Sequence, residues 1–166
     1  SGPCANLPEV PRSDQTVAVL VVSPSEGTVS GLRCIFQHTN WSFFHVSSCR
    51  EAVAFLKKRA LAVVIAEYRL PDGTWKSLLD AVARNPMPPA AAPPLVVVTS
   101  ADADDGMWSE VLNLGGYDIL PMPFDRGEVT RVISLAWLHW MESCRAAHRM
   151  PGRAGAEAPT AMQASA

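Results

Sequence analysis

The sequence lacks any long apolar run, since no stretch of about 18 uninterrupted apolar residues occurs in it. Its N-terminus also lacks the charged and then apolar layout of a signal peptide. The four cysteines, Cys4, Cys34, Cys49 and Cys144, form no C-x-x-C pair and show no metal-ligand spacing. We therefore expect a soluble, cytoplasmic protein with free thiols and no membrane association.

An excess of charge of one sign is also missing. The formal net charge is -2, and no block rich in Lys or Arg is present to hold a phosphate backbone. We therefore expect no direct nucleic-acid partner. What the sequence does contain is 48 % apolar residues in a chain of 166 residues, which is enough to bury the core of one domain without disulfides.

Strand-like and helix-like patterns alternate along the chain. Continuous apolar runs predict five buried strands, and each is followed by a segment with helical spacing of apolar residues. The strands are expected at residues 17–22, 41–46, 61–66, 95–99 and 117–120, and the helices at 26–37, 48–59, 74–84, 102–114 and from 125 onward. With right-handed crossovers, this order predicts an α/β, doubly wound, three-layer sandwich around a five-stranded parallel sheet.

Three segments lack these patterns. Residues 85–94 include five prolines, which lack amide donors, and they predict a stiff loop within the domain. Residues 1–15 look irregular, and residues 147–166 show no apolar period. We therefore expect one domain over residues 16–146, preceded by an irregular N-terminal segment and followed by a tail or linker.

One carboxylate is delivered into a turn by the third predicted strand. Glu67 follows the run Leu61-Ala-Val-Val-Ile-Ala66 and comes shortly before Leu70-Pro-Asp-Gly73. In parallel α/β sheets, ligands and chemistry are placed beyond the carboxyl ends of the strands. Glu67 is therefore a candidate site residue.

Further motifs accompany Glu67 in a fixed order. The fourth strand ends Val-Val-Val-Thr99-Ser-Ala101, and a Gly-Gly-Tyr117-Asp segment leads to Met122-Pro-Phe124. Together with Leu-Pro-Asp-Gly73, these motifs resemble the receiver domain of bacterial two-component response regulators over about residues 16–142. The resemblance implies a flavodoxin-like (βα)5 fold with strand order 2-1-3-4-5, and a role in phosphorelay signal transduction.

The resemblance also implies where a phosphorylation site would lie. In the family, an Asp accepts the phosphoryl group, two acidic residues bind Mg²⁺, a Thr or Ser contacts the phosphoryl group, and a Lys completes the site. In that order, the matching positions are Glu67, the pair Ser23 and Pro24, Thr99, and Met122. Only Thr99 has the residue type that the family pattern expects.

These departures predict a degenerate site. Ser23 and Pro24 supply almost no anionic oxygen, so Mg²⁺ binding should be lost or very weak, and no cofactor is expected. Glu67 is one methylene longer than Asp, which should move the nucleophilic oxygen by about 1 Å and slow phosphoryl transfer by orders of magnitude. Met122 carries no cation. We therefore expect a pseudo-receiver that is not an enzyme and that signals by contact with a protein partner, such as a sensor kinase or an output protein.

Two interpretations of Glu67 stay open. In one, its charge partly imitates the phosphorylated state and draws Thr99 inward; in the other, Glu67 is a solvated residue at a strand end. The alternative functions are a phosphorylation-competent receiver, and the regulatory domain of a longer DNA-binding transcription regulator.

The last helix carries more apolar residues than one packed face needs. Its core stripe runs with helical spacing from Val129 to Cys144, while Leu135, Leu138 and the marginal Trp137 add a second apolar face. Excess apolar surface indicates association. We therefore expect a homodimer through this helix, with Trp137 and Leu138 in the contact surface.

Overall fold

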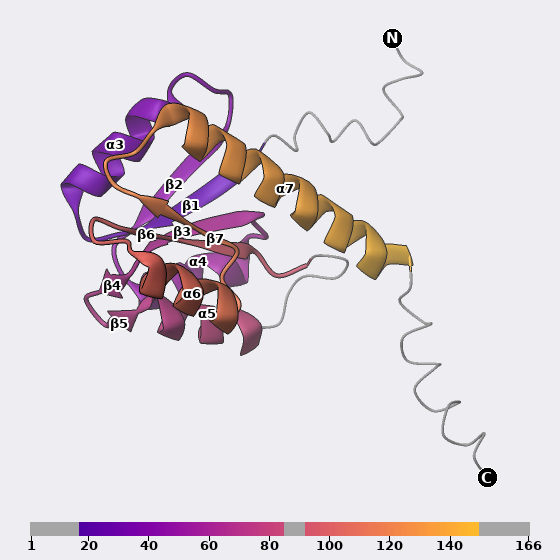
Figure 1. Cartoon of the computed structure of the whole chain (residues 1–166). Helices are drawn as coiled ribbons and strands as arrows, with labels where there is room; N and C mark the ends of the chain where they lie inside the picture. Colours follow the sequence, from indigo (N-terminus) through magenta and orange to yellow (C-terminus); the bar gives the residue numbers. More distant parts are fainter. Residues whose placement is uncertain (1–16, 85–91, 150–166) are drawn as a thin grey trace.

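The computed structural model describes residues 17–84 and 92–149 (Figure 1). Its main sheet contains five parallel strands in the order β2-β1-β3-β6-β7. These strands are β1 (Ala18–Val22), β2 (Ser42–Val46), β3 (Val63–Glu67), β6 (Leu95–Ser100) and β7 (Asp118–Pro121). Counted along the chain, they have the order 2-1-3-4-5, so the predicted topology is confirmed.

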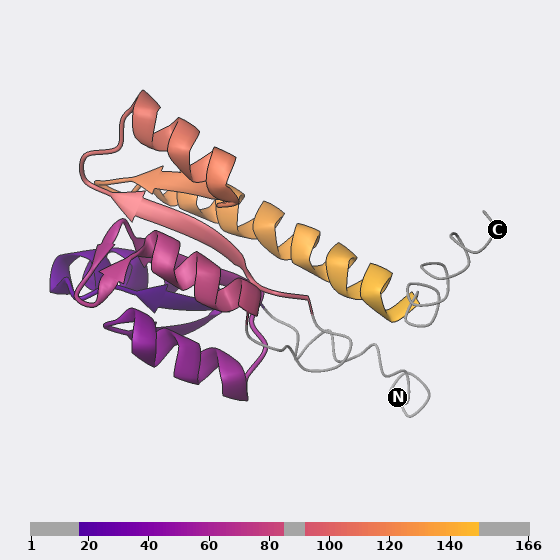
Figure 2. The ribbon, with the colours of Figure 1, turned by 90° about the horizontal axis from the view of Figure 1, so that it is seen from below.

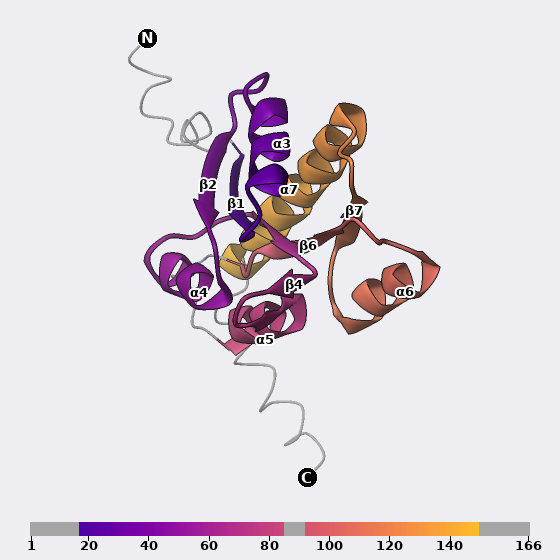
Figure 3. The ribbon, with the colours of Figure 1, turned by 90° about the vertical axis from the view of Figure 1, so that its left-hand side faces the viewer.

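Helices cover both faces of this sheet, which gives three layers (Figure 3). The apolar residues of α3 (Glu26–Phe36) and α7 (Arg126–Arg149) pack on one face. Those of α4 (Cys49–Lys58), α5 (Trp75–Arg84) and α6 (Asp105–Leu114) pack on the other face. The predicted doubly wound sandwich is therefore confirmed.

The central strand β1 is apolar at every position because both faces of the sheet are covered. In β1, Val19 and Val21 belong to the core beneath α3 and α7. Leu20 and Val22 belong to the core beneath α4, α5 and α6. All four side chains are fully buried, which explains the continuous apolar run in the sequence.

Polar side chains mark the beginnings of the helices. The Ser25 hydroxyl accepts a hydrogen bond from the Thr28 amide at the start of α3, and the Ser48 hydroxyl accepts one from the Glu51 amide at the start of α4. The Glu51 carboxylate accepts a hydrogen bond from the amide of Ser47 at 2.8 Å, just before this helix. Asp125 accepts from the Glu128 amide at 2.8 Å and so begins α7 as expected.

Two local features differ from the sequence prediction. The turn after β3 contains a short antiparallel hairpin of β4 (Arg69–Leu70) and β5 (Gly73–Thr74), in which Gly73 has a φ of +151° that favours glycine. Helix α6 begins at Asp105 and not at Asp102, because the Asp104 carboxylate accepts from the Met107 amide and caps the helix.

Parts of the predicted domain organisation fall outside the described residues. These are the irregular segment 1–15 and the tail beyond residue 149, together with Cys4 and most of the proline-rich loop. Helix α7 continues to Arg149, past the predicted boundary at residue 146. Within the described ranges, Cys34, Cys49 and Cys144 are free thiols, and no helix is both long and apolar enough to cross a membrane.

Candidate functional site

Four positions singled out in the sequence lie at the edge of the sheet where the parallel strands end. Ser23 follows β1, Glu67 ends β3, Thr99 lies in β6, and Met122 follows β7. Glu67 and Thr99 are direct neighbours in the register of β3 and β6. An open cleft of about 310 Å³ lies here, and its lining includes Glu67, Thr99, Met122, Thr28, Arg69 and Asp102.

The Glu67 carboxylate is held by two hydroxyl groups. The Ser23 hydroxyl donates to Oε2 of Glu67 at 2.7 Å, and the Thr28 hydroxyl donates to the same oxygen. Glu67 is half-buried, whereas Ser23 and Thr28 are buried. The Glu67 carboxylate therefore joins the end of β3 to the end of β1 and the first turn of α3, while the side chain also lines the open cleft.

Ser23 is fixed within this arrangement by several bonds. Its side chain is 0 % exposed, and its hydroxyl accepts a hydrogen bond from the Ser25 amide at 3.0 Å while it donates to Glu67. The adjacent Pro24 is exposed and offers no donor or charge. The Ser23 hydroxyl is thus already used as a structural link between β1 and β3.

Thr28 is the part of the site that the sequence reasoning missed. It lies three residues after Ser25, the residue that caps α3, and therefore in the first turn of that helix. The first turn of a helix that follows a parallel strand lies at the carboxyl edge of the sheet, where Glu67 ends its strand. The signal available in the sequence was a hydroxyl residue three positions after the capping serine, which places it at the carboxyl edge of the sheet.

Thr99 directs its hydroxyl away from Glu67. The Thr99 hydroxyl donates to the carbonyl oxygen of Leu120 in β7 at 2.8 Å, and the Thr99 side chain is buried. Thr99 therefore links β6 to β7, and its proton is not given to the carboxylate beside it.

Met122 contacts the same cluster without supplying a charge. Its sulfur lies 3.8 Å from the Thr28 hydroxyl oxygen, and its peptide bond to Pro123 is cis. Among the described residues that line the cleft, Arg69 is the one with a cationic side chain. The Arg69 guanidinium lies over the Tyr68 ring, 5.9 Å from the ring centre, and not beside Glu67 in any hydrogen bond or ion pair of the described chain.

These donors do not fit Mg²⁺, the metal that the receiver resemblance implies. Mg²⁺ requires near-octahedral oxygen ligands and is usually bound through carboxylates and retained waters. Here Ser23 and Pro24 provide one hydroxyl, whose proton is directed at Glu67. Across residues 17–84 and 92–149, no group of three or more His, Cys, Asp or Glu side chains is arranged to hold a metal ion.

No protein-family model matches the chain, and no curated protein sequence matches it. Solved structures do. The signal receiver domain of an HD domain-containing protein from Pseudomonas fluorescens Pf-5 aligns with a TM-score of 0.67 at 19 % identity, over 77 % of this chain and 91 % of that one. The beryllofluoride-activated NtrC4 receiver domain dimer gives 0.65 at 23 %, over 74 % and 98 %. The chain has the fold of a response-regulator receiver domain.

A third receiver structure was solved together with a partner protein. It is the receiver domain of Ssk1 from Saccharomyces cerevisiae, crystallised with the histidine phosphotransfer signalling protein Ypd1. It aligns with a TM-score of 0.61 at 17 % identity, over 72 % of this chain and 87 % of that one. At these identities the likeness concerns the receiver fold, and the predicted flavodoxin-like class is confirmed.

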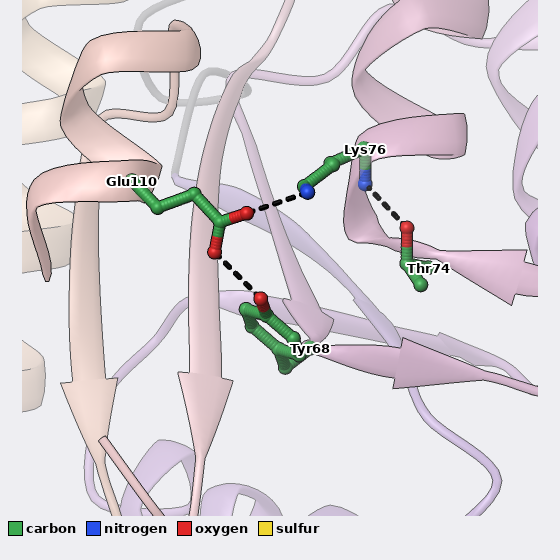
Figure 4. A network of polar contacts seen from close by, with 4 residues as sticks. All are labelled: Tyr68, Thr74, Lys76 and Glu110. Atoms are coloured by element: carbon green, nitrogen blue, oxygen red, sulfur yellow. Dashed lines mark hydrogen bonds and ion pairs between the residues drawn. The ribbon is translucent and has the colours of Figure 1, made fainter. Parts of the chain in front are cut away.

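A second polar network of this receiver fold lies beside the site (Figure 4). The Tyr68 hydroxyl donates to Glu110 Oε1 at 2.5 Å, and Lys76 Nζ lies 2.5 Å from Glu110 Oε2. The pKa values of Tyr68 and Lys76 are both raised, in each case mainly by the residue's own hydrogen bond to Glu110. The same two hydrogen bonds lower the pKa of the Glu110 carboxyl, and the one from Lys76 has the larger effect. This network connects the end of β3 with α5 and α6.

Asp72 makes a third polar link at the same edge. Its carboxylate accepts from the amide of Cys49 at 2.9 Å and from the amide of Arg50 at 3.0 Å, at the beginning of α4. These backbone donors lower the pKa of Asp72, with the Cys49 amide as the largest cause. Asp72 of the Leu-Pro-Asp-Gly73 motif therefore ties the hairpin after β3 to α4.

The residues of the predicted contact surface on α7 differ in exposure. Trp137 is half-buried and packs against the core beneath α3 and α7. Leu138 is 55 % exposed and Leu135 is 45 % exposed. The outward apolar surface of α7 therefore consists of Leu135 and Leu138, and Trp137 supports it from the core side.

Helix α7 extends past the ends of the strands, as Figure 2 shows. Its 24 residues correspond to about 36 Å of helix, about twice the length of a five-residue strand. The Trp140 indole donates to the Ala92 carbonyl oxygen at 2.9 Å, and the Ala92 amide donates to the Cys144 sulfur at 3.3 Å. The later turns of α7 are thus anchored to the segment that precedes β6.

Proposed function

We propose that this chain is an atypical receiver domain of two-component signal transduction that acts by protein–protein contact without phosphorylation of an aspartate. The observation that carries the proposal is the hydrogen bonding of the Glu67 carboxylate. Both the Ser23 hydroxyl and the Thr28 hydroxyl donate to its Oε2 atom, in the place where a receiver would hold its phosphoacceptor and metal. A carboxylate engaged in this way serves as a structural joint and is a poor nucleophile for in-line phosphoryl transfer.

The surroundings of Glu67 support this proposal over one in which the carboxylate imitates a phosphorylated state. Imitation requires Glu67 to attract Thr99, but the Thr99 hydroxyl donates to the Leu120 carbonyl oxygen. The position of the expected lysine holds Met122, so no cation is present there to neutralise a transferred phosphoryl group. The proposed domain is therefore not an enzyme, and it requires neither Mg²⁺ nor another cofactor.

The proposed partners are proteins. The Ssk1 receiver domain was crystallised with the phosphotransfer protein Ypd1, so one protein with this fold is a binding partner of a phosphorelay protein. For this chain we propose a sensor kinase or an output protein of the bacterial cytoplasm as the partner. Neither nucleic acid nor membrane is part of the proposal.

We further propose a homodimer through α7. Leu135 and Leu138 lie one helical turn apart and are both about half exposed, with fractions of 45 % and 55 %. An apolar pair on the outer face of a helix whose inner face already packs on the sheet favours association. One solved relative of this fold, the NtrC4 receiver domain, is a dimer.

The phosphorylation part is tested by amide NMR on the intact chain. We expect acetyl phosphate, or beryllofluoride, added with Mg²⁺ to leave the amide spectrum unchanged. A gain-of-function variant provides the positive control: Ser23→Asp, Pro24→Asp, Glu67→Asp and Met122→Lys together restore the residue types of an ordinary receiver site. Shifts clustered at Glu67, Thr99 and Met122 in the unaltered chain would overturn the proposal and favour the phosphorylation-competent alternative.

The dimer is tested by sedimentation equilibrium. Leu135→Glu with Leu138→Glu should convert a dimer into a monomer, because the change sets four like charges in the contact surface of the pair. The matched control is Leu112→Glu with Leu114→Glu in α6, since these leucines are equally exposed, at 49 % and 50 %. A monomer before any substitution, or dissociation by the α6 control, contradicts a dimer through α7.

A further inference from the structure

The charges of this chain are divided between the two edges of its sheet. Residues 26–59, which form α3, β2 and α4, carry five cationic side chains against two carboxylates, a formal net charge of +3; the cations are Arg33, Arg50, Lys57, Lys58 and Arg59. Residues 102–125, around α6 and β7, carry six carboxylates and no Lys or Arg. β2 and β7 are the opposite edge strands of the sheet (Figure 3). A chain with a net charge of only -2 therefore has one basic edge and one acidic edge.

The basic edge also presents free backbone groups. The Ser42 amide donates to the carbonyl oxygen of Val17, and the Val46 carbonyl oxygen accepts from the amide of Ser23. The even-numbered residues of β2 therefore direct their amide and carbonyl groups toward β1. Because these directions alternate along a strand, the peptide groups of Phe43 and His45 face outward. No strand pairs with this side of β2 in the described part of the chain. β2 can therefore accept a further strand.

Two arginines flank this edge strand, one on each face of the sheet. The Arg33 guanidinium from the last turn of α3 lies 4.7 Å from the centre of the Phe43 ring. The Arg59 guanidinium from the end of α4 lies 4.6 Å from the centre of the Phe44 ring. Both arginines are exposed, and neither pairs with a carboxylate of the described residues. The rings hold both guanidinium groups beside the strand with their hydrogen-bond donors available.

We infer that the β2 edge, flanked by Arg33 and Arg59, is a docking site for an acidic, extended segment of another protein, which adds to the sheet as a strand. Successive side chains of an added strand point to opposite faces of the sheet. Two adjacent acidic residues therefore meet Arg33 on the α3 face and Arg59 on the α4 face. Backbone pairing with Phe43 and His45 supplies affinity, and the two charge pairs supply selectivity.

A separate protein is the favoured occupant over a second copy of this chain. The acidic edge of another copy would also match the charge, but contact between opposite edges is head-to-tail and does not close into a dimer. The site lies on a different edge from the proposed α7 contact and does not depend on the phosphorylation state of Glu67. The inference therefore stands or falls independently of the proposed function.

The test uses the full chain and a fluorescent peptide of about eight residues with a central Glu-Glu pair between Val and Thr residues. We expect binding that weakens with salt, with amide NMR shifts at residues 42–46. Arg33→Glu with Arg59→Glu should weaken binding at least about 10-fold, because both flanking charges are reversed. Arg33→Gln with Arg59→Gln, which only neutralises the charges, should give a smaller loss in the same direction and guards against a folding defect.

Matched controls separate this site from general electrostatic attraction. Arg84→Glu with Arg126→Glu makes the same change in net charge away from β2 and should leave binding intact. A peptide with central Lys-Lys, or one with proline replacing a residue that pairs with β2, should not bind. Equal loss in both charge variants, or shifts confined to α6 and α7, overturns the inference. Tighter binding of a single-stranded oligonucleotide of equal charge, or self-association that competes with the peptide, also overturns it.

Discussion

Glu67 and Glu110 are two carboxylates at the same edge of the sheet, connected by the adjacent residue Tyr68, and they are satisfied in different ways. Glu67 accepts from the neutral hydroxyls of Ser23 and Thr28, both of which are buried. Glu110 accepts from Tyr68 and pairs with the cation of Lys76, which is exposed. At Glu67 the oxygen acceptor matters because buried donors depend on it, whereas at Glu110 the negative charge matters.

Replacing Glu67 should give the largest effect. Glu67→Ala leaves the fully buried Ser23 hydroxyl and the Thr28 hydroxyl without their shared acceptor, and a loss of about 2 kcal/mol in unfolding free energy is expected. Urea denaturation measures it. Glu67→Gln is the matched control, because an amide oxygen in the place of Oε2 still accepts from both hydroxyls, and it should lose less than half as much. Equal losses for the two variants would mean that the charge of Glu67 is what the fold requires.

Asp72 resembles both carboxylates. Like Glu67 it accepts hydrogen bonds from neutral donors, here two backbone amides, and like Glu110 it depends on its negative charge. Asp72→Asn should cost about 1 kcal/mol, since a neutral amide replaces the carboxylate that accepts from the Cys49 and Arg50 amides at the start of α4. The backbone amides, that of Cys49 first, hold the pKa of Asp72 below its ordinary value of 3.8. The charged carboxylate therefore stabilises the fold above pH 3.8, and this stabilisation is lost as the pH falls through the folded-state pKa. Thermal unfolding of both proteins at neutral and acidic pH checks this. A destabilisation of the same size at both pH values would contradict the role of the charge.

The sequence predicted the sheet well because its strands are buried on both faces and read as apolar runs, as in Val63–Glu67. It also predicted that Glu67 and Thr99 lie together, because parallel strands end at one edge. The partners of these side chains were not predictable in the same way. Thr28 reaches Glu67 across 39 residues and Tyr68 reaches Glu110 across 42, so both contacts depend on how the helices sit on the sheet.

The surface of α7 shows the same limit. Helical spacing identified Val129, Val132 and Ala136 as core residues, and all three are buried. The same spacing left Trp137 at the margin, where a large ring is able to turn inward or outward. It packs on the core, while the smaller Leu135 and Leu138 remain exposed. Whether a side chain at the margin of the stripe points toward the core depends on its size and on the space beside it. The periodic pattern gives information on neither.

Replacing Glu110 should give the smallest effect, and pH separates it from the others. Glu110→Gln removes the charge that pairs with Lys76 but keeps an acceptor for Tyr68, so only a slight fall in the urea midpoint is expected at neutral pH. The pKa of Glu110 is lowered from 4.5, which means that its charged form stabilises the fold above that pH. Below the folded-state pKa, Glu110 is protonated and resembles Gln, so the difference between the proteins should vanish. Urea midpoints measured for both proteins from neutral to acidic pH test this, with Lys76→Met as the matched loss of the partner charge. A difference that persists in acid would show that Glu110, like Glu67, acts through its oxygen acceptors and not through its charge.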